Sequence, residues 1–149
     1  MKVKKIPVLL LAAALSAFLL AGCSPQPEAV YPDFDASKVI QVEVQSNMAN
    51  PPAFSLLSPE DQAFACGLLC LLTGTPETDP GTEGRIGMPT RFRFTLENGE
   101  QFTLSTSGGE NYDIKLTTPE ETSYYQAEYY QLEPWTELTG EYFDWNILD

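Results

Sequence analysis

Two cysteines in the middle of the chain are the side chains best suited to covalent chemistry. Cys66 and Cys70 lie four residues apart in a segment expected to be helical, so they share one face. Helix neighbours at this spacing have Cβ atoms about 5–6 Å apart, whereas a disulfide requires roughly 3.5–4.5 Å. The pattern favours two small buried apolar residues. A strained disulfide, or a thiol that binds metal or acts in catalysis, remains as an alternative.

The absence of histidine from the sequence removes the commonest general base and the commonest metal ligand. A catalytic triad built on histidine and a zinc site containing histidine are therefore excluded. The sequence also has neither a Gly-x-Ser-x-Gly nor a Cys-x-x-Cys pattern. We expect no cofactor and no metal, and we keep a small hydrolase or a thiol-redox enzyme only as an alternative to a binding protein.

Arginines and tyrosines supply the candidate binding residues. Arg91 and Arg93 alternate with phenylalanines, so both lie on the hydrophilic face of a predicted strand. They are suited to clamping an anion or to pairing with acidic side chains on neighbouring strands. Tyrosine is frequent in protein interfaces, and its flat ring also stacks on sugars; the alternative is that half of the tyrosines pack on the core. The tyrosines in question are Tyr124, Tyr125, Tyr129 and Tyr130.

The first 22 residues have the pattern of a secretory signal peptide. Three lysines precede an apolar run over residues 6–21, and small residues end it. This run is shorter than the roughly 20 residues that a transmembrane helix needs, and the proline-rich stretch after it adds no apolar length. We expect residues 1–22 to be removed and residues 23–37 to form a flexible tether.

The segment Leu20-Ala21-Gly22-Cys23 resembles the lipobox of bacterial lipoproteins. In that family a signal peptidase cuts just before the cysteine, whose thiol is joined to diacylglycerol. The resemblance implies that Cys23 begins the mature chain and carries the lipid. Several acyl chains, at about 0.8 kcal/mol for each buried CH₂ group, give stable anchoring. The implied location is the outer, extracytoplasmic face of the cell membrane.

The net charge of the chain limits the classes of molecule that it can bind. The sequence holds 8 basic and 21 acidic side chains, a net charge of −13. Loss of the three signal-peptide lysines leaves five basic against 21 acidic side chains, or −16. Nucleic acid is excluded as a partner, because Lys and Arg must neutralise its phosphates. Anionic lipid surfaces and anionic wall polymers are disfavoured for the same reason.

Residues 38–149 predict a single α+β domain. Alternating apolar and polar residues, or a wealth of β-formers, indicate five extended segments. Ile40, Val42 and Val44 are expected to share the buried face of the first. Asn98-Gly99 is suited to a type I′ turn within the hairpin. The segments are 39–45, 53–57, the hairpin 91–105, 111–116 and 124–132.

Two helices complete the expected domain. Ser58 is a natural N-cap and Pro59 suits the first helical position, so the main helix is predicted over about 58–73, with Gly74 ending it. A mobile loop is expected at about 74–89, and Pro134 opens a short C-terminal helix whose Trp135, Leu138 and Tyr142 lie at helical spacing. The expected apolar stripe of the main helix is Phe64, Leu68, Leu71 and Leu72.

The predicted architecture is a small antiparallel sheet of hairpins with the main helix packed on one face. Its predicted function is that of a lipid-anchored, non-enzymatic domain that binds an envelope protein or a glycan. Besides the enzyme alternative, the hairpin 91–105 would suit an inhibitor of a protease or a lytic enzyme.

Replacing Cys23 with serine tests the lipid anchor. Serine has no thiol on which the thioether to diacylglycerol can form, so we expect Cys23→Ser to lose labelled palmitate and to leave the membrane fraction. Cys70→Ser, which changes a cysteine outside the lipobox, should keep both properties. Equal labelling and equal membrane association of Cys23→Ser and the unmodified sequence would contradict the lipobox interpretation.

Overall fold

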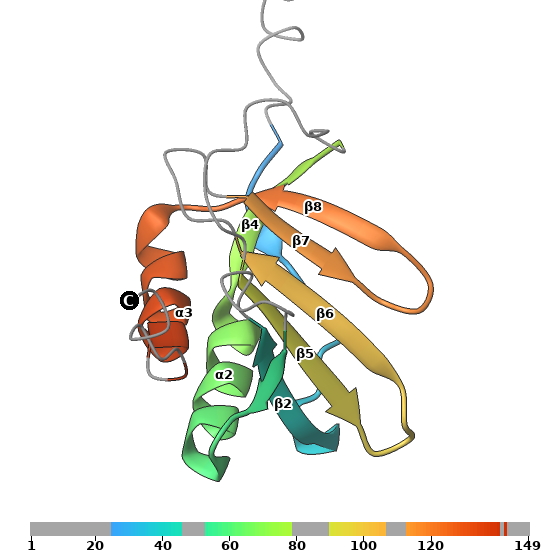
Figure 1. The fold of residues 1–149 in the computed structure, drawn as a ribbon. Helices are drawn as coiled ribbons and strands as arrows, with labels where there is room; N and C mark the ends of the chain where they lie inside the picture. The colour runs from blue at the N-terminus through green and yellow to red at the C-terminus, as the bar shows by residue number, and fades with distance from the viewer. Residues whose placement is uncertain (1–24, 46–52, 79–89, 107–112, 141, 143–149) are drawn as a thin grey trace, which may run out of the picture.

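The alternation along each strand organises the protein around one antiparallel sheet, covered on one side by two helices (Figure 1). The computed structural model describes residues 25–45, 53–78, 90–106, 113–140 and 142; the predicted signal peptide and Cys23 lie outside them. The sheet order is β1-β4-β8-β7-β6-β5-β2-β3. The strands are β1 (Glu28–Ala29), β2 (Val39–Gln45), β3 (Phe54–Leu56), β4 (Thr73–Glu77), β5 (Thr90–Leu96), β6 (Gln101–Thr106), β7 (Asp113–Thr117) and β8 (Thr122–Gln126). The helices are the short 3₁₀ helix η1 (Ala36–Lys38), α2 (Pro59–Leu71) and α3 (Tyr129–Gly140). The predicted α+β class, with one main helix and a shorter C-terminal one, is confirmed.

The core lies between the inner face of the sheet and the helices. Phe92 and Phe94 on β5 are fully buried, and the ring of Phe94 stacks on that of Phe102 with centroids 4.7 Å apart. Trp135 of α3, also fully buried, meets the ring of Phe92 edge-on at 4.9 Å. Aromatic pairs in these geometries contribute about 0.5–1.5 kcal/mol beyond the area that they bury. Aromatic contacts therefore join β5 to β6 and β5 to α3.

The hairpin predicted over 91–105 is confirmed as β5 and β6, but its turn is not type I′. Such a turn needs positive φ at both central residues, and among the described residues only Gly99, at 83°, has a positive φ. The Gly99 N–H donates to the Leu96 carbonyl at 2.9 Å, and the Leu96 N–H donates to the Glu100 carbonyl at 2.9 Å. The loop is thus a turn closed by one left-handed glycine, which leaves Asn98 in an ordinary conformation.

The first predicted strand is confirmed as β2, with one side chain on the wrong face. Val42 and Val44 are buried as expected, but Ile40 is exposed. The pairing of β2 with β5 shifts register between Val39 and Gln41. Such a bulge adds one residue to a strand and interrupts the alternation, so Ile40 leaves the row that its spacing predicted.

The main helix begins as its sequence predicts. Ser58 is the N-cap, and its Oγ accepts from the Asp61 N–H at 3.2 Å. Beyond the end of α3, the Tyr142 hydroxyl accepts from the Ser58 N–H at 2.8 Å and donates to the Asp61 carboxylate. The hydrogen bonds from Tyr142 and then from Ser58 lower the pKa of Asp61. The start of α2 is therefore tied to the C-terminal part of the chain.

The expected apolar stripe of α2 is wrong. The residues of the helix that are buried are Ala65, Cys66 and Leu69, whereas Phe64 and Leu71 are exposed. All ten residues from 63 to 72 are apolar. Because no polar face marks the solvent side of this segment, the spacing of its large residues does not decide which side packs on the sheet.

The tether prediction is wrong over residues 28–37. Glu28–Ala29 pairs with β4, and the N–H of the buried Val30 donates to the Leu72 carbonyl at 3.0 Å. The rings of Tyr31 and Phe34 both contact that of Phe102, at 5.1 and 5.8 Å. These aromatic side chains gave the segment apolar surface to bury, so the folded domain begins before residue 38.

The C-terminal elements are divided differently from the expectation. The strand β8 ends at Gln126, and α3 begins at Tyr129 with Pro134 inside it, rather than starting at that proline. The Thr73 N–H donates to the Gln131 side-chain carbonyl at 3.0 Å, and Leu132 is buried. Tertiary contacts made by the first turn of α3 thus override the strand preference of Tyr129 and Tyr130. Of the residues expected at helical spacing, Trp135 and Leu138 lie in α3 and are buried, whereas Tyr142 lies beyond its end.

Gly74 does not end α2, as the sequence had suggested, but lies buried in β4. The same strand takes up the beginning of the predicted loop, whose residues 79–89 lie outside the described ranges. A Cβ atom on Gly74 would lie 2.7 Å from Tyr125 Cβ and 3.1 Å from the Gln126 carbonyl oxygen. The missing side chain is therefore what allows β4 to lie this close to β8.

Alanine at the two glycines should have opposite effects on stability. We expect Gly74→Ala to lower the free energy of unfolding by about 1–3 kcal/mol, because the backbone must shift to admit the methyl group. Gly67→Ala is the matched control: its Cβ meets nothing within 4 Å, and alanine in a helix should add about 0.5–1 kcal/mol. Urea unfolding followed by circular dichroism measures both. A Gly74→Ala chain as stable as Gly67→Ala would contradict the close packing of β4 on β8.

Candidate functional site

The side chains that alternate with the core residues form the outer sheet face, opposite the helices. Because Phe92 and Phe94 point inward, Arg91 and Arg93 must point outward. Strand pairing continues this face in two rows across the sheet. The first row is Gln45, Arg91, Ser105, Lys115 and Tyr124, and the second is Glu43, Arg93, Thr103 and Thr117.

Basic side chains are concentrated on the outer sheet face. Of the four lysines and arginines in the described ranges, Arg91, Arg93 and Lys115 lie there and only Lys38 lies elsewhere. By strand register, the acidic residues of this face are Glu43, beside Arg93, Glu77, which pairs with Tyr124 at one end of the first row, and Asp113, which pairs with Gln126. In a chain of net charge −13, this distribution makes the face much less acidic than the molecule as a whole.

Arg93 is the most constrained cation of this face. Its Nε and Nη2 atoms both lie 2.7 Å from Glu43 Oε2, and its guanidinium carbon lies 3.8 Å from the centroid of the Phe54 ring. In cation–π contacts of this kind, the cation that lies on the face of the ring is more often arginine than lysine. The pairing that the sequence left as one alternative for the arginines is therefore present at Arg93.

Arg91 and Lys115 are less constrained than Arg93. The Arg91 side chain is exposed and donates to Gln45 Oε1 at a long 3.4 Å. The Lys115 ammonium lies 5.6 Å from the centroid of the Tyr124 ring, on the neighbouring strand. Guanidinium and ammonium donors beside an aromatic ring can bind carboxylate or phosphate oxygens and can stack on a flat ligand group.

The four candidate tyrosines do not form one surface. Tyr124 belongs to the outer sheet face, whereas Tyr125 is buried on the inner face, where burial raises the pKa of its hydroxyl. Tyr129 and Tyr130 are exposed on the first turn of α3. The expectation of a single tyrosine-rich strand fails because β8 ends before the second pair.

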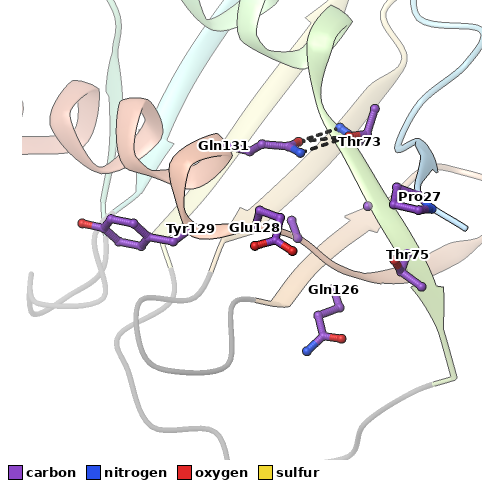
Figure 2. A pocket seen from close by; sticks show the side chains of 9 residues that line it. Pro27, Thr73, Thr75, Gln126, Glu128, Tyr129 and Gln131 are labelled. Atoms are coloured by element: carbon purple, nitrogen blue, oxygen red, sulfur yellow. Dashed lines mark hydrogen bonds between the residues drawn. The ribbon is translucent and has the colours of Figure 1, made fainter.

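A hollow of about 380 Å³ lies between β4, the end of β8 and the start of α3 (Figure 2). Gln131 spans one wall: its amide accepts from the Thr73 N–H at 3.0 Å and donates to Thr73 Oγ1 at 3.1 Å. Figure 2 shows the Glu128 carboxylate at this hollow and the Tyr129 ring pointing away from β4. The described lining contains neither a cysteine nor a lysine.

The two cysteines of α2 are free thiols in different surroundings. Cys66 is buried, and burial raises the pKa of its thiol to about 11; Cys70 is exposed. The expectation of two buried apolar residues is therefore right for Cys66 and wrong for Cys70. A thiol with so high a pKa stays protonated at neutral pH, which disfavours Cys66 as a nucleophile or a metal ligand.

Two further expectations bear on alternative functions. No group of three or more potential metal-ligating side chains occurs within the described ranges. The hairpin proposed for an inhibitor occupies the middle of the sheet, since β5 also pairs with β2 and β6 with β7. Within the hairpin, the exposed residues are Arg91 and the tip, residues 97–101.

Comparison of the chain with models of known protein families, with curated proteins and with solved structures finds no match.

Sequence reasoning missed two members of the outer sheet face. Lys115 alternates with Ile114 and Leu116, which are both buried, so the rule that placed the arginines outside applies to it as well. Phe54 carried no such signal. Its position beside Arg93 depends on the register in which β3 pairs with β2.

The two thiols should differ in reactivity. In full-length chain carrying Cys23→Ser, we expect a thiol reagent at pH 8 to label Cys70 in the folded protein and Cys66 only after unfolding. Cys70→Ala should abolish labelling of the folded chain, and Cys66→Ala should not. Because unfolded Cys66 ionises near its ordinary value of 9.0 and folded Cys66 only near 11, stability should fall as pH rises through that window. Rapid labelling of folded Cys66 would contradict its burial.

Proposed function

We propose that this protein is a lipid-anchored, non-enzymatic domain on the extracytoplasmic face of a cell membrane, and that it binds an envelope protein or a glycan through its outer sheet face. The observation that carries the binding proposal is the gathering of Arg91, Arg93 and Lys115 on one face of an otherwise acidic chain. Anionic groups, carboxylate or phosphate, are the ligand chemistry that this face suits best.

The form of the face supports a binding role. Its two rows contain threonine, serine and glutamine side chains beside the cations, and the rings of Phe54, next to Gln45, and of Tyr124, next to Lys115, lie on opposite sides of the first row's cations. Short polar side chains leave the sheet surface open to an extended ligand, while the rings offer stacking surface. An extended carboxylated glycan or an acidic protein segment fits such a surface.

The proposed anchor would hold this face near the membrane. No helix among the described residues is long and apolar enough to cross a bilayer. Because β1 begins at Glu28, only four residues lie between it and Cys23, and a chain spans at most about 3.5 Å per residue. The folded domain would therefore start within about 17 Å of the backbone of Cys23. Its ligand would accordingly be a component close to the same membrane.

Single-charge substitutions test the outer sheet face. We expect Arg91→Gln and Lys115→Gln each to weaken binding of a polyuronate or of poly-glutamate by roughly threefold or more, the effect of losing one exposed ion pair. Lys38→Gln removes the same charge away from this face, next to Asp35, and should leave the affinity unchanged. Titration calorimetry at low and high salt measures the effect, which salt should reduce. Dextran, a neutral glycan, separates charge recognition from stacking on sugars.

The Glu43→Gln substitution should have the opposite effect on binding, because it removes a negative charge from the outer sheet face. Removing the carboxylate beside Arg93 leaves the guanidinium available, so we expect tighter binding of the same anionic polymers. Equal affinities for the unmodified chain, Arg91→Gln, Lys115→Gln and Glu43→Gln would contradict this binding face. A preference for poly-glutamate over polyuronate would identify the ligand as protein, and the reverse preference would identify it as glycan.

A further inference from the structure

The solvent side of α2 is apolar along most of its length. We define the α2 ridge as Ala63, Phe64, Gly67, Cys70 and Leu71, all of them exposed. Phe64 and Leu71 leave 50% and 80% of their surface exposed. Residues 63–72 contain no polar side chain, so this ridge has no hydrophilic group between its first and last members. Exposed apolar surface of this extent on a small domain commonly marks an interaction site.

Grooves flank the α2 ridge on both sides. One, of about 690 Å³, runs between α2 and the start of β2, and its lining includes Val39 and the exposed Ile40. The other, of about 290 Å³, lies between α2 and α3 and is lined by Leu68, Tyr130 and Pro134, among others. The ridge and the two grooves together form one apolar surface, which we call the apolar relief, of the kind that receives an amphipathic helix.

Gly67 lies at the centre of this relief. A Cβ atom built there meets nothing within 4 Å, so the space above it is open. Phe64 and Leu71 lie three and four residues to either side, on the same helical face. A helix laid across the ridge could therefore approach the α2 backbone closely at Gly67 while its side chains pack between the two large ones.

The borders of the apolar relief on α2 and α3 are acidic. Glu60 shares the face of Phe64 one turn earlier on α2. On α3, Glu133 and Glu137 are exposed and lie three and seven residues after Tyr130, on its face of the helix. Charge complementarity thus requires a partner with basic residues beside its apolar surface. A second copy of the chain would bring acid against acid, and an anionic lipid surface would be repelled.

We propose that the α2 ridge and its grooves form a docking site for an amphipathic helix of another protein, with lysine or arginine flanking its apolar stripe. The proposal rests on residues of α2, α3 and β2 and is independent of the anionic ligand suggested for the outer sheet face. It assigns the protein a second surface, on the side of the helices away from the sheet.

A designed peptide tests the site without knowledge of the natural partner. The probe is an amphipathic helix of leucine and lysine, and its control has the same leucine pattern with glutamate in place of lysine. We expect the full-length chain with Cys23→Ser to bind the leucine–lysine peptide and not the control, as measured by fluorescence anisotropy. Replacing Phe64 and Leu71 together by glutamate should weaken binding by about tenfold or more, as for contacts at the centre of an interface.

Substitution by glutamate distinguishes docking on the apolar surface from unspecific attraction between the basic peptide and the acidic chain. If lysines merely bind an acidic chain, the Phe64→Glu, Leu71→Glu chain should bind the peptide more tightly, not less. Leu56→Glu is the matched control, since Leu56 is 58% exposed on β3, away from the ridge, and it should not weaken binding. Changing Glu133 and Glu137 to lysine should shift the preference toward the leucine–glutamate peptide. Arg91→Gln and Lys115→Gln should leave binding of the leucine–lysine peptide unchanged, which separates this site from the outer sheet face.

Three results would overturn the proposal. The first is undiminished binding to the Phe64→Glu, Leu71→Glu chain. The second is a self-association, seen by analytical ultracentrifugation, that this substitution abolishes, because the ridge would then be a contact between two copies. The third is a large fall in the melting temperature of the doubly substituted chain relative to Leu56→Glu, because the ridge would then be covered within the chain itself.

Discussion

The burial of one face of the antiparallel sheet is the constraint on which the rest of the structure depends. Phe92, Phe94 and their cross-strand partner Phe102 occupy that face, and strand geometry sends every intervening residue to the other side. The arginines between the phenylalanines are therefore outside because the aromatic residues are inside. The same packing that stabilises the domain thus gathers the cations into one surface.

The layer that covers the sheet is assembled from distant parts of the chain. Tyr31 and Phe34 come from the N-terminal segment and Trp135 from α3, while α2 lies between them in sequence. The hydrogen bonds from Ser58 through Tyr142 to Asp61 tie the start of α2 to the end of this layer. Because α2 is apolar on all sides from residue 63 onward, it can fill this layer and still present apolar surface to solvent.

The two proposed surfaces lie on opposite sides of the molecule, one on the open side of the sheet and one on the outer side of the helices (Figure 1). They also have opposite chemistry, since one concentrates cations and the other is apolar with an acidic border. A domain with this arrangement can hold two different ligands at once without competition between them. A lipid at Cys23 would place both within a short distance of the membrane.

By itself, the sequence determined the features that depend on local patterns. The N-cap at Ser58, the hairpin of β5 and β6, and the outward arginines follow from side-chain chemistry or from alternation within a few residues, and the structure has them. Where a segment is apolar throughout, as over residues 63–72, or where a bulge moves Ile40 outward, local patterns do not define a face. Gly74 against Tyr125, and Phe54 beside Arg93, likewise depend on strands far apart in sequence. Only the tertiary structure decided these, because burial depends on which segments meet, and such meetings leave no periodicity in the chain.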